Sequence, residues 1–240
     1  MADAQASTVF HTSAWARLWL ETWPGSKWEA LVVREGPAYV GGLGAIVREG
    51  VLGRTVLAMP FATYGGPIVR RGHDDPSAVR RRLLEGYAAR VRSGRTLVSE
   101  LTWYEGNAAE VPANLPAEPA FTHVRELDDD FEALMAALDH AARARVRQAV
   151  EYGLTVRRVT DAAGVSLYHQ LAIRTMQRRS GRPKALALYQ RIFEQLVPAG
   201  LARYDLVDHQ GVAIAGSSAA FPSYQVSSET SVRPLRTRAA

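Results

Sequence analysis

The stretch Arg143-Ala-Arg-Val-Arg-Gln-Ala-Val-Glu-Tyr-Gly-Leu-Thr-Val156 joins two kinds of secondary structure. Its first part continues an apolar stripe that begins at Phe131 and recurs at helical spacing, which predicts a helix over residues 131–152. Gly153 suits the left-handed position that follows a helix end, and residues 154–159 then read as a strand. A long helix that passes through a glycine into a strand indicates a chain that mixes α and β elements.

The residues around this junction extend the pattern in both directions. The carboxylates of residues 128–130 suit the positive N-terminal end of the helix, and a strand is predicted before them, over residues 121–127. Downstream, the sequence predicts two helices and then a hairpin whose connection is Asp208-His-Gln-Gly211. The helices are expected over residues 162–179 and 186–197, and the hairpin strands over residues 201–207 and 212–221.

The first half of the sequence predicts a similar set of elements. Trp15, Leu18 and Trp19 follow Ser13 at helical spacing, which predicts a helix with Ser13 as its N-cap. Three short strand-like runs come next, and because turn residues join them they predict an antiparallel meander. An amphipathic helix and a further strand complete this half. The runs cover residues 30–34, 40–48 and 55–59, the helix residues 75–92 and the strand residues 96–103.

These elements predict an α/β (α+β) fold of two related halves, with mixed, mostly antiparallel sheets flanked by helices. Residues 107–119 are rich in Ala, Asn and Pro and lack periodicity, so they read as a linker. The first domain is then expected over residues 1–106 and a partial second domain over residues 120–228. Residues 229–240 have neither periodicity nor core residues and are expected to form a disordered tail.

The chain has 240 residues and a formal net charge of +5, and that charge rests on arginine. Lys27 and Lys184 are the only lysines among 29 basic residues. Arginine binds phosphates and carboxylates with a planar fork, so the charge favours an anionic partner such as a tRNA, a nucleotide-linked acceptor or coenzyme A. A nucleic-acid-binding protein is a further reading of the charge, but the sequence lacks interleaved exposed aromatic residues.

Composition also excludes several kinds of site. The chain has no cysteine, which excludes disulfides, thiolate metal sites and a cysteine nucleophile. Its six histidines are scattered without the i, i+4 spacing of a helical metal site, so no metal is expected. The apolar stretches fall short of the about 20 residues that a membrane-spanning helix needs, and residues 1–8 lack the basic start of a secretory signal. We therefore expect a cytoplasmic protein without an integral membrane segment.

Four segments, spread over most of the chain, together resemble the FemAB-like branch of the GNAT acyltransferase superfamily. They are similar to the family patterns PF-x-x-YGG, R-x-x-I-R-x-A-x-x-x-G-x-x-V, T-x-R-R-x-G-x-P and dG-x-x-x-A-G, in that order. Their order and spacing also agree with the family. The segments are Met59-Pro-Phe-Ala-Thr-Tyr-Gly-Gly-Pro-Ile68, the junction of residues 143–156, Thr175-Met-Gln-Arg-Arg-Ser-Gly-Arg-Pro183 and Leu206-Val-Asp-His-Gln-Gly-Val-Ala-Ile-Ala-Gly216.

The resemblance implies an N-acyltransferase with two GNAT-like halves. Such an enzyme would pass an acetyl, other acyl or aminoacyl group to an amine of a cell-envelope or polysaccharide precursor. The donor would be acyl-CoA or aminoacyl-tRNA. Members of the family that build peptidoglycan cross-bridges use aminoacyl-tRNA and a lipid- or nucleotide-linked muropeptide. Neither the residues nor the resemblance determine the oligomeric state.

The family normally continues further than this chain, with the last strands and a helix of the second domain. In ordinary GNAT folds, that part holds the pyrophosphate of coenzyme A on a helix N-terminus. On this comparison we expect the second half to be incomplete. The alternative to an active transferase is therefore a truncated, noncatalytic remnant or binding module of the same fold.

Two glutamates are the candidates for a catalytic base. Aminolysis of an ester or thioester needs a positioned amine and a base that accepts the amine proton. Glu100 lies at the end of a predicted strand and Glu151 near the end of the long predicted helix. Either side chain could instead be solvated.

The long predicted helix also carries candidates for binding an anionic substrate. At about 100° per residue, Arg143, Arg147 and Glu151 share a face beside the apolar stripe, and Arg147 and Glu151 could form an i, i+4 pair. This face is either solvated or, as the family match at Arg143 and Arg147 supports, a contact for an anionic ligand. Arg145 falls within the apolar stripe, so we expect it to meet a carboxylate, a carbonyl or a ligand phosphate.

Two turns supply the remaining candidates. Arg178, Arg179 and Arg182 crowd the turn at Gly181, which could hold a phosphate or carboxylate or could be a solvated helix end. The turn Tyr64-Gly65-Gly66 is predicted mainly to shape the end of a strand, because paired glycines allow positive φ. Its bare backbone could also approach a substrate.

Overall fold

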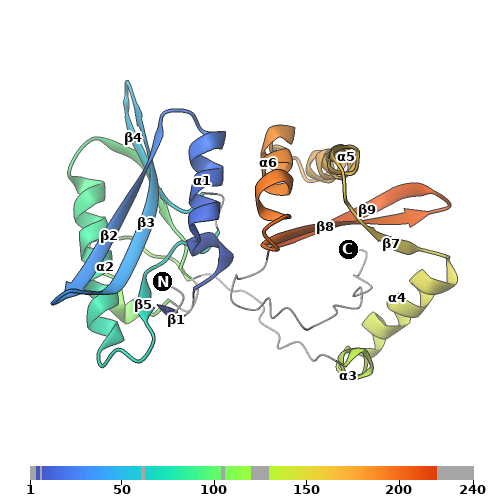
Figure 1. Cartoon of the computed structure of the whole chain (residues 1–240), viewed down its shortest axis with the longest axis horizontal. Coiled ribbons are helices and arrows are strands. Elements are labelled where there is room, and N and C mark those ends of the chain that lie inside the picture. The colour runs from blue at the N-terminus through green and yellow to red at the C-terminus, as the bar shows by residue number, and fades with distance from the viewer. Residues whose placement is uncertain (1–3, 6, 61–62, 104–105, 120–129, 221–240) are drawn as a thin grey trace. The chain divides into compact units, whose positions relative to one another are not determined.

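The computed structural model describes residues 4–5, 7–60, 63–103, 106–119 and 130–220. The described residues form two compact units, one within residues 1–120 and the other within residues 121–220 (Figure 1). Each unit has its own cluster of buried apolar residues. Both units combine a sheet with flanking helices, so the predicted α/β class is confirmed.

The first unit is built on a six-stranded mixed sheet. Strands β2, β3 and β4 form an antiparallel meander, as predicted from the sequence. β5 pairs with β3 and with β1, and β6 lies parallel to β4. The strands are β1 (Ala4–Gln5), β2 (Ser26–Glu35), β3 (Ala38–Gly50), β4 (Gly53–Ala58), β5 (Ile68–Arg70) and β6 (Thr96–Leu101).

Two helices cover the opposite faces of this sheet (Figure 1). α1 (Ser13–Thr22) begins after Thr12, whose side chain accepts a hydrogen bond from the backbone N–H of Trp15. Thr12 is therefore the N-cap, one residue before the predicted Ser13. α2 (Pro76–Arg92) begins at the predicted place, with Asp75 as its N-cap and a proline in its first turn. Its buried residues, Val79, Leu83, Leu84 and Tyr87, pack on the sheet.

The predicted linker is partly built into the first unit. Residues 108–110 form a short 3-10 helix, η2 (Ala108–Glu110), and Glu110 is buried. Its carboxylate accepts hydrogen bonds from Arg80 at 2.6 and 2.7 Å and from Ser77 at 2.6 Å. Because Arg80 and Ser77 belong to α2, these bonds fix η2 against that helix.

The second unit has a three-stranded antiparallel sheet in the order β7, β8, β9. Helices α5 and α6 pack on one face of it (Figure 1), around the buried Val159, Val165, Tyr204 and Leu206. All five elements lie within two residues of their predicted positions, and the largest difference is that β8 ends two residues later than predicted. Their bounds are β7 (Thr155–Arg158), α5 (Ala162–Arg178), α6 (Leu186–Leu196), β8 (Ala202–His209) and β9 (Val212–Ala220).

The predicted long helix is broken in two. α3 (Phe131–Ala136) has Ala137 as its C-cap, and α4 (His140–Glu151) begins after Asp139. The side chain of Asp139 accepts a hydrogen bond from the N–H of Ala142 at 2.6 Å, so Asp139 acts as an N-cap inside the predicted helix. Gly153 has a φ of 67°, as its predicted place after the helix end requires.

Three predicted features lie outside the described residues. They are the strand over residues 121–127, the carboxylates of residues 128 and 129, and the tail over residues 229–240. Within the described part of the chain, none of the helices is long and apolar enough to span a membrane.

Candidate functional site

The carboxyl ends of β4 and β6 form the first candidate region. These two strands are parallel, and ligands of open α/β sheets bind beyond the carboxyl ends of parallel strands. After Ala58 the chain leaves the sheet through Met59, which has a left-handed φ of 69°. It returns at Tyr64, which forms a parallel bridge with Thr102, and the N–H of Gly65 donates to the carbonyl of Thr102 at 2.9 Å.

The two glycines of this turn are required by close packing. A Cβ on Gly65 would lie 1.9 Å from the carbonyl oxygen of Ala58, and one on Gly66 would lie 2.3 Å from the ring of Trp103. Neither position has room for a larger residue. The predicted role of Tyr64-Gly65-Gly66 in shaping a strand end thus has a physical cause, and its role in substrate binding stays a prediction.

Aromatic residues and one histidine cover this turn from the start of the chain. The short 3-10 helix η1 (Val9–His11) places the Phe10 ring 4.9 Å from that of Trp15 and 6.1 Å from that of Tyr64. Within the described residues, the buried indole nitrogen of Trp15 has no hydrogen-bond partner. These aromatic residues enclose the turn on the side of α1.

His11 fastens η1 to the glycine turn. Its Nε2 lies 3.1 Å from the carbonyl oxygen of Gly66, and its Nδ1 lies 3.1 Å from the N–H of Thr8. Burial lowers the pKa of His11, so a neutral ring donates through Nε2 and accepts through Nδ1. Both ring nitrogens are engaged, which gives His11 a positioning role.

Sequence reasoning did not find His11 or Trp103, because their contacts come from segments far apart in the chain.

Glu100 lies near Tyr64 on the same face of the sheet. Side chains alternate along β6, so Glu100 and Thr102 share a face, and Tyr64 joins them through its pairing with Thr102. Glu100 is half-buried. Its backbone carbonyl accepts a hydrogen bond from the hydroxyl of Tyr87 at 3.1 Å, which holds this part of β6 on α2. The structure therefore brings together one predicted base and one predicted binding residue.

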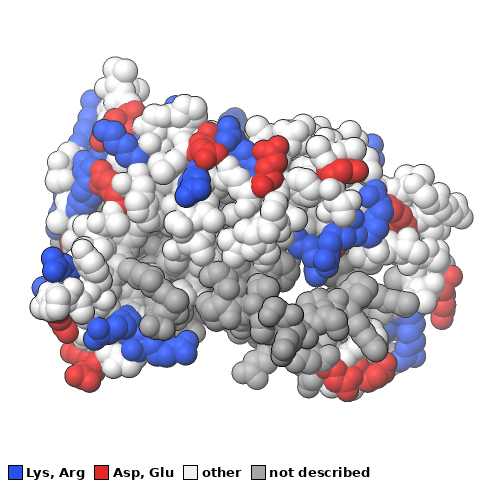
Figure 2. All heavy atoms as spheres, viewed as in Figure 1, with Lys and Arg blue, Asp and Glu red and all other residues white. Residues whose placement is uncertain are grey.

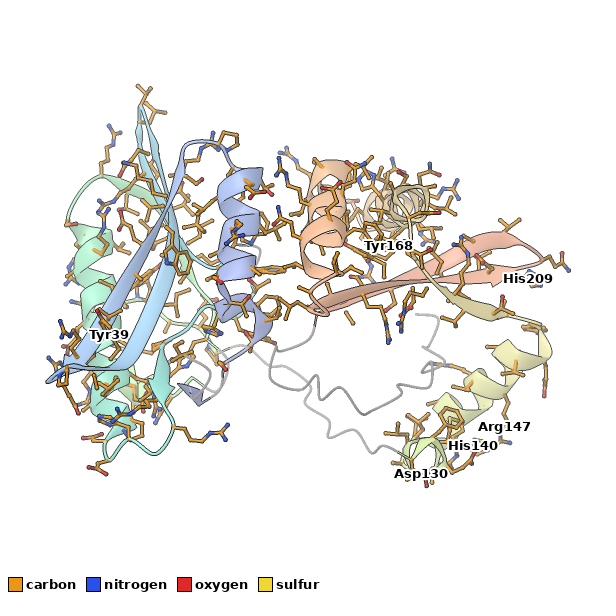
Figure 3. All side chains as sticks on the ribbon, viewed as in Figure 1. Tyr39, Asp130, His140, Arg147, Tyr168 and His209 are labelled. Carbon is orange, nitrogen blue, oxygen red and sulfur yellow. The ribbon has the colours of Figure 1, made fainter. Side chains whose placement is uncertain are left out.

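The predicted candidates on α4 are arranged differently from expectation. Arg143 donates to the carbonyl of Ala136 at 2.8 Å and also to that of Leu138, so it closes the turn between α3 and α4. Arg145, Arg147 and Glu151 are exposed, and no ion pair joins Arg147 to Glu151. Figure 3 shows Arg147 and His140 on this helix. The expected place of Arg145 within the buried stripe is wrong, because Arg145 is exposed, whereas Ala142 of that stripe is buried.

The second predicted arginine group lies at the C-terminal end of α5. Arg178, Arg179 and Arg182 are exposed there, and Ser180 adopts a left-handed φ of 53°. The N–H of Gly181 donates a hydrogen bond to the carbonyl of Met176 at 2.8 Å, so it is not available to a ligand. A helix C-terminus is negative and suits cations, so these arginines complement the helix dipole. Any anion held there would have to bind through the guanidinium groups themselves.

A third charged group, which sequence reasoning missed, lies on the strands of the second unit. Tyr204 and Leu206 face the helices, so Arg203 and Asp205 lie on the other face of β8. The carboxylate of Asp205 is 2.7 Å from Nε of Arg203 and 4.0 Å from Nε of Arg158. Figure 2 shows basic side chains gathered over β7 and β8.

This third group can bind an anion. Guanidinium forks bind phosphates and carboxylates well, and Arg158 lies 4.0 Å from the carboxylate of Asp205, farther than the 2.7 Å of Arg203. The side chain of Arg158 keeps 53% of its area exposed. The group depends on the register that pairs Arg158 with Asp205, which spacing along the sequence does not indicate.

Tyrosines form the core between the helices and the sheet of the second unit. The ring of Tyr168 lies 4.9 Å from that of Tyr204 and 5.7 Å from that of Tyr189. Its hydroxyl donates to that of Ser218 on β9 at 3.1 Å (Figure 3 labels Tyr168 on α5). Burial raises the pKa of Tyr189 and of Tyr204. Tyr189 and Tyr204 are therefore neutral, and the three tyrosines pack against the strands that carry the third charged group.

The described residues contain no group of His, Asp and Glu side chains arranged to hold a metal ion. No family model matches the sequence, and no curated protein matches it. Among solved structures, the fold is similar to the crystal structure of FemX, with a TM-score of 0.58 and 14% sequence identity.

The likeness to FemX extends over both units. It covers 86% of this chain, which is more than either unit contains. It covers 54% of the FemX chain, so this chain spans about half the length of that structure. At this identity, the likeness is one of fold.

Proposed function

We propose that this chain is a Fem-type transferase, which passes an aminoacyl group from a tRNA to an amine of a peptidoglycan precursor. The observation that carries the proposal is the likeness of fold to FemX over both units. The four segments that resemble the FemAB-like family support it independently, because they rest on residue patterns and not on the fold. In this proposal each unit is a GNAT-like half.

The reaction is an aminolysis. The amine nitrogen attacks the carbonyl carbon of the aminoacyl ester, the bond from that carbon to the ribose oxygen breaks, and an amide forms. The amine gives a proton to a base, and the ribose oxygen takes a proton as it leaves. Positioning of the two substrates supplies most of the acceleration, on the order of 7–11 kcal/mol.

Glu100 is the base that the geometry supports best. It is half-buried at the strand ends and shares its face with Tyr64, whereas Glu151 is exposed at the end of α4. Arg158 is the residue we propose for an anionic part of a substrate, because 53% of its side chain is exposed and its Nε lies 4.0 Å from the carboxylate of Asp205. Arg145 and Arg147 are further candidates, since no described residue neutralises them.

The proposal is tested by direct assay. The purified chain is incubated with alanyl-tRNA and a UDP-linked muropeptide, and the acceptor is examined by mass spectrometry for the addition of one alanyl residue. Acetyl-CoA replaces the tRNA in a parallel reaction, which tests the other donor. A folded chain that transfers nothing from either donor would contradict the proposal and would favour the noncatalytic binding module.

A pair of matched variants tests the base. We expect Glu100→Gln to lower kcat by about 10²–10⁴-fold with little change in KM, the usual range for general-base catalysis. Glu151→Gln removes the same charge from an exposed position, and we expect it to retain activity. Loss of activity in Glu151→Gln alone would assign the proton transfer to α4 instead. The backbone bond from Tyr87 is kept in Glu100→Gln, so the fold of β6 is not disturbed.

A further inference from the structure

The first unit contains a small cavity between its sheet and α2. The cavity has a volume of about 280 Å³. Its floor is apolar, and Tyr87 and Arg90 close it from α2. The floor residues come from three neighbouring strands and are Leu31, Leu43, Ala45 and Val56.

The walls of the cavity are held in fixed positions. The hydroxyl of Tyr87 lies 3.2 Å from the carbonyl oxygen of Val56 and 3.1 Å from that of Glu100, so the ring cannot swing into the space. Ala45 is buried and presents only a methyl group. A larger residue at position 45 would fill the space, whereas the alanine leaves it open.

The rim of the cavity is an ion pair. Nε and Nη2 of Arg90 donate to the two carboxylate oxygens of Glu29 at 2.6 and 2.7 Å. The side chains are 28% and 37% exposed, so the pair faces solvent at the mouth. A guanidinium has five N–H donors, and within the described part of the chain Glu29 is the partner that hydrogen-bonds the Arg90 side chain.

These features define the ligand. An apolar cavity of about 150 Å³ can hold benzene, so this one has room for a larger ring with a short substituent. The spare N–H groups of Arg90 favour a hydrogen-bond acceptor at the mouth. The adjacent carboxylate of Glu29 disfavours an anion there, since like charges repel.

We propose that this cavity is a binding site for a compact apolar molecule whose head is a neutral carbonyl, bound by Arg90. The proposal is independent of the transfer reaction, because none of the cavity residues is assigned to that chemistry. Acetophenone has the proposed features. Benzoate has nearly the same size with an anionic head, and ethylbenzene has nearly the same size without an acceptor.

The test is a titration of the full chain with each probe, followed by ¹H–¹⁵N chemical shifts. We expect acetophenone to shift the amides of Leu31, Ala45 and Arg90 with a saturable curve. Ethylbenzene and benzoate should each bind at least several-fold more weakly. Shifts spread over the surface, or equal binding of the three probes, would overturn the proposal.

Two variants test the location of the site. Ala45→Leu fills the cavity and should abolish binding of acetophenone, whereas Ala163→Leu adds the same atoms at an exposed position of α5 and should leave binding unchanged. Leu43→Ala enlarges the cavity and should tighten binding of a larger aryl ketone relative to acetophenone. This second variant decides the question if Ala45→Leu fails to fold. Binding that ignores both cavity variants would place the ligand elsewhere.

Discussion

Arg54 is a buried arginine at the start of β4, with a relative exposure of 8%. Its side chain donates to the hydroxyls of Thr96 at 3.0 Å and Ser93 at 3.2 Å, and to the carbonyl of Arg90. No carboxylate accepts from it among the described residues. Its charge lies instead beside the C-terminal carbonyls of α2, where the helix dipole favours a cation. One side chain thus joins β4, β6 and α2.

We expect Arg54→Ala to lower the free energy of unfolding by about 3 kcal/mol, since it removes charged hydrogen bonds and leaves a buried carbonyl unsatisfied. Arg54→Lys should recover part of the loss. The measurement is urea unfolding followed by circular dichroism, with Arg81→Ala on the exposed face of α2 as the matched control. An equal, small effect of Arg54→Ala and Arg81→Ala would contradict this role.

Glu110 gives the first unit a dependence on pH. Hydrogen bonds from Arg80, and secondly from Ser77, lower its pKa below the ordinary value of 4.5. A depressed folded-state pKa stabilises the fold above pH 4.5, and this stabilisation is lost as the pH falls through the folded value. We expect the difference in stability between the natural chain and Glu110→Gln to shrink between pH 6 and about pH 3. Unfolding curves across this range test it, with Glu118→Gln at an exposed position as the matched control.

At the scale of the secondary-structure element, two side chains fix the break between α3 and α4. Asp139 caps α4, and Arg143 donates to the carbonyl of Ala136, the last residue of α3. We expect Asp139→Ala to destabilise α4 by about 1 kcal/mol, because an orphan N–H loses its acceptor. Hydrogen exchange of the amides of residues 142–146 should then accelerate. Asp130→Ala removes the cap of α3 alone and should leave those amides unchanged; an equal acceleration in both variants would show that the two helices open together.

Most elements could be predicted from the sequence because their signals are local. The meander, α2, α5 and α6 rest on period, caps and turn residues that act within a few positions. The break at Asp139 was missed, because a stripe of apolar residues continues across it and the cap competes with that stripe. β5 was missed because three residues carry no period, and it forms by pairing with β3 and β1, which are distant in the sequence.

At the scale of the whole molecule, the two units have separate apolar cores. Leu83 belongs to one and Leu206 to the other, and both are almost fully buried. We expect Leu83→Ala and Leu206→Ala each to cost about 3 kcal/mol. Hydrogen exchange should rise only in the unit that carries the substitution. Exchange that rises in both units for either variant would show that they unfold as one.

The candidate sites were predicted only in part, because some of their contacts depend on the fold of a whole unit. The turn of Tyr64 and the strand end of Glu100 carry their own local signals, and the register then brings them to one face. The contact of His11 with Gly66 and the sharing of Asp205 by Arg158 and Arg203 arise from chain segments that meet only in the fold. The spacing of residues along the sequence does not indicate contacts between segments that are distant in the chain.

The connection between β8 and β9 consists of Gln210 and Gly211, which have φ values of 52° and 78°. Two left-handed residues make the turn that matches the twist of a hairpin, so these strands can meet within about 1–10 μs. β6, in contrast, reaches β4 only after the chain has closed a loop that contains β5 and all of α2. Loop closure costs entropy. The sheet of the second unit should therefore begin to assemble, through the β8–β9 hairpin, before β6 pairs with β4 in the first unit.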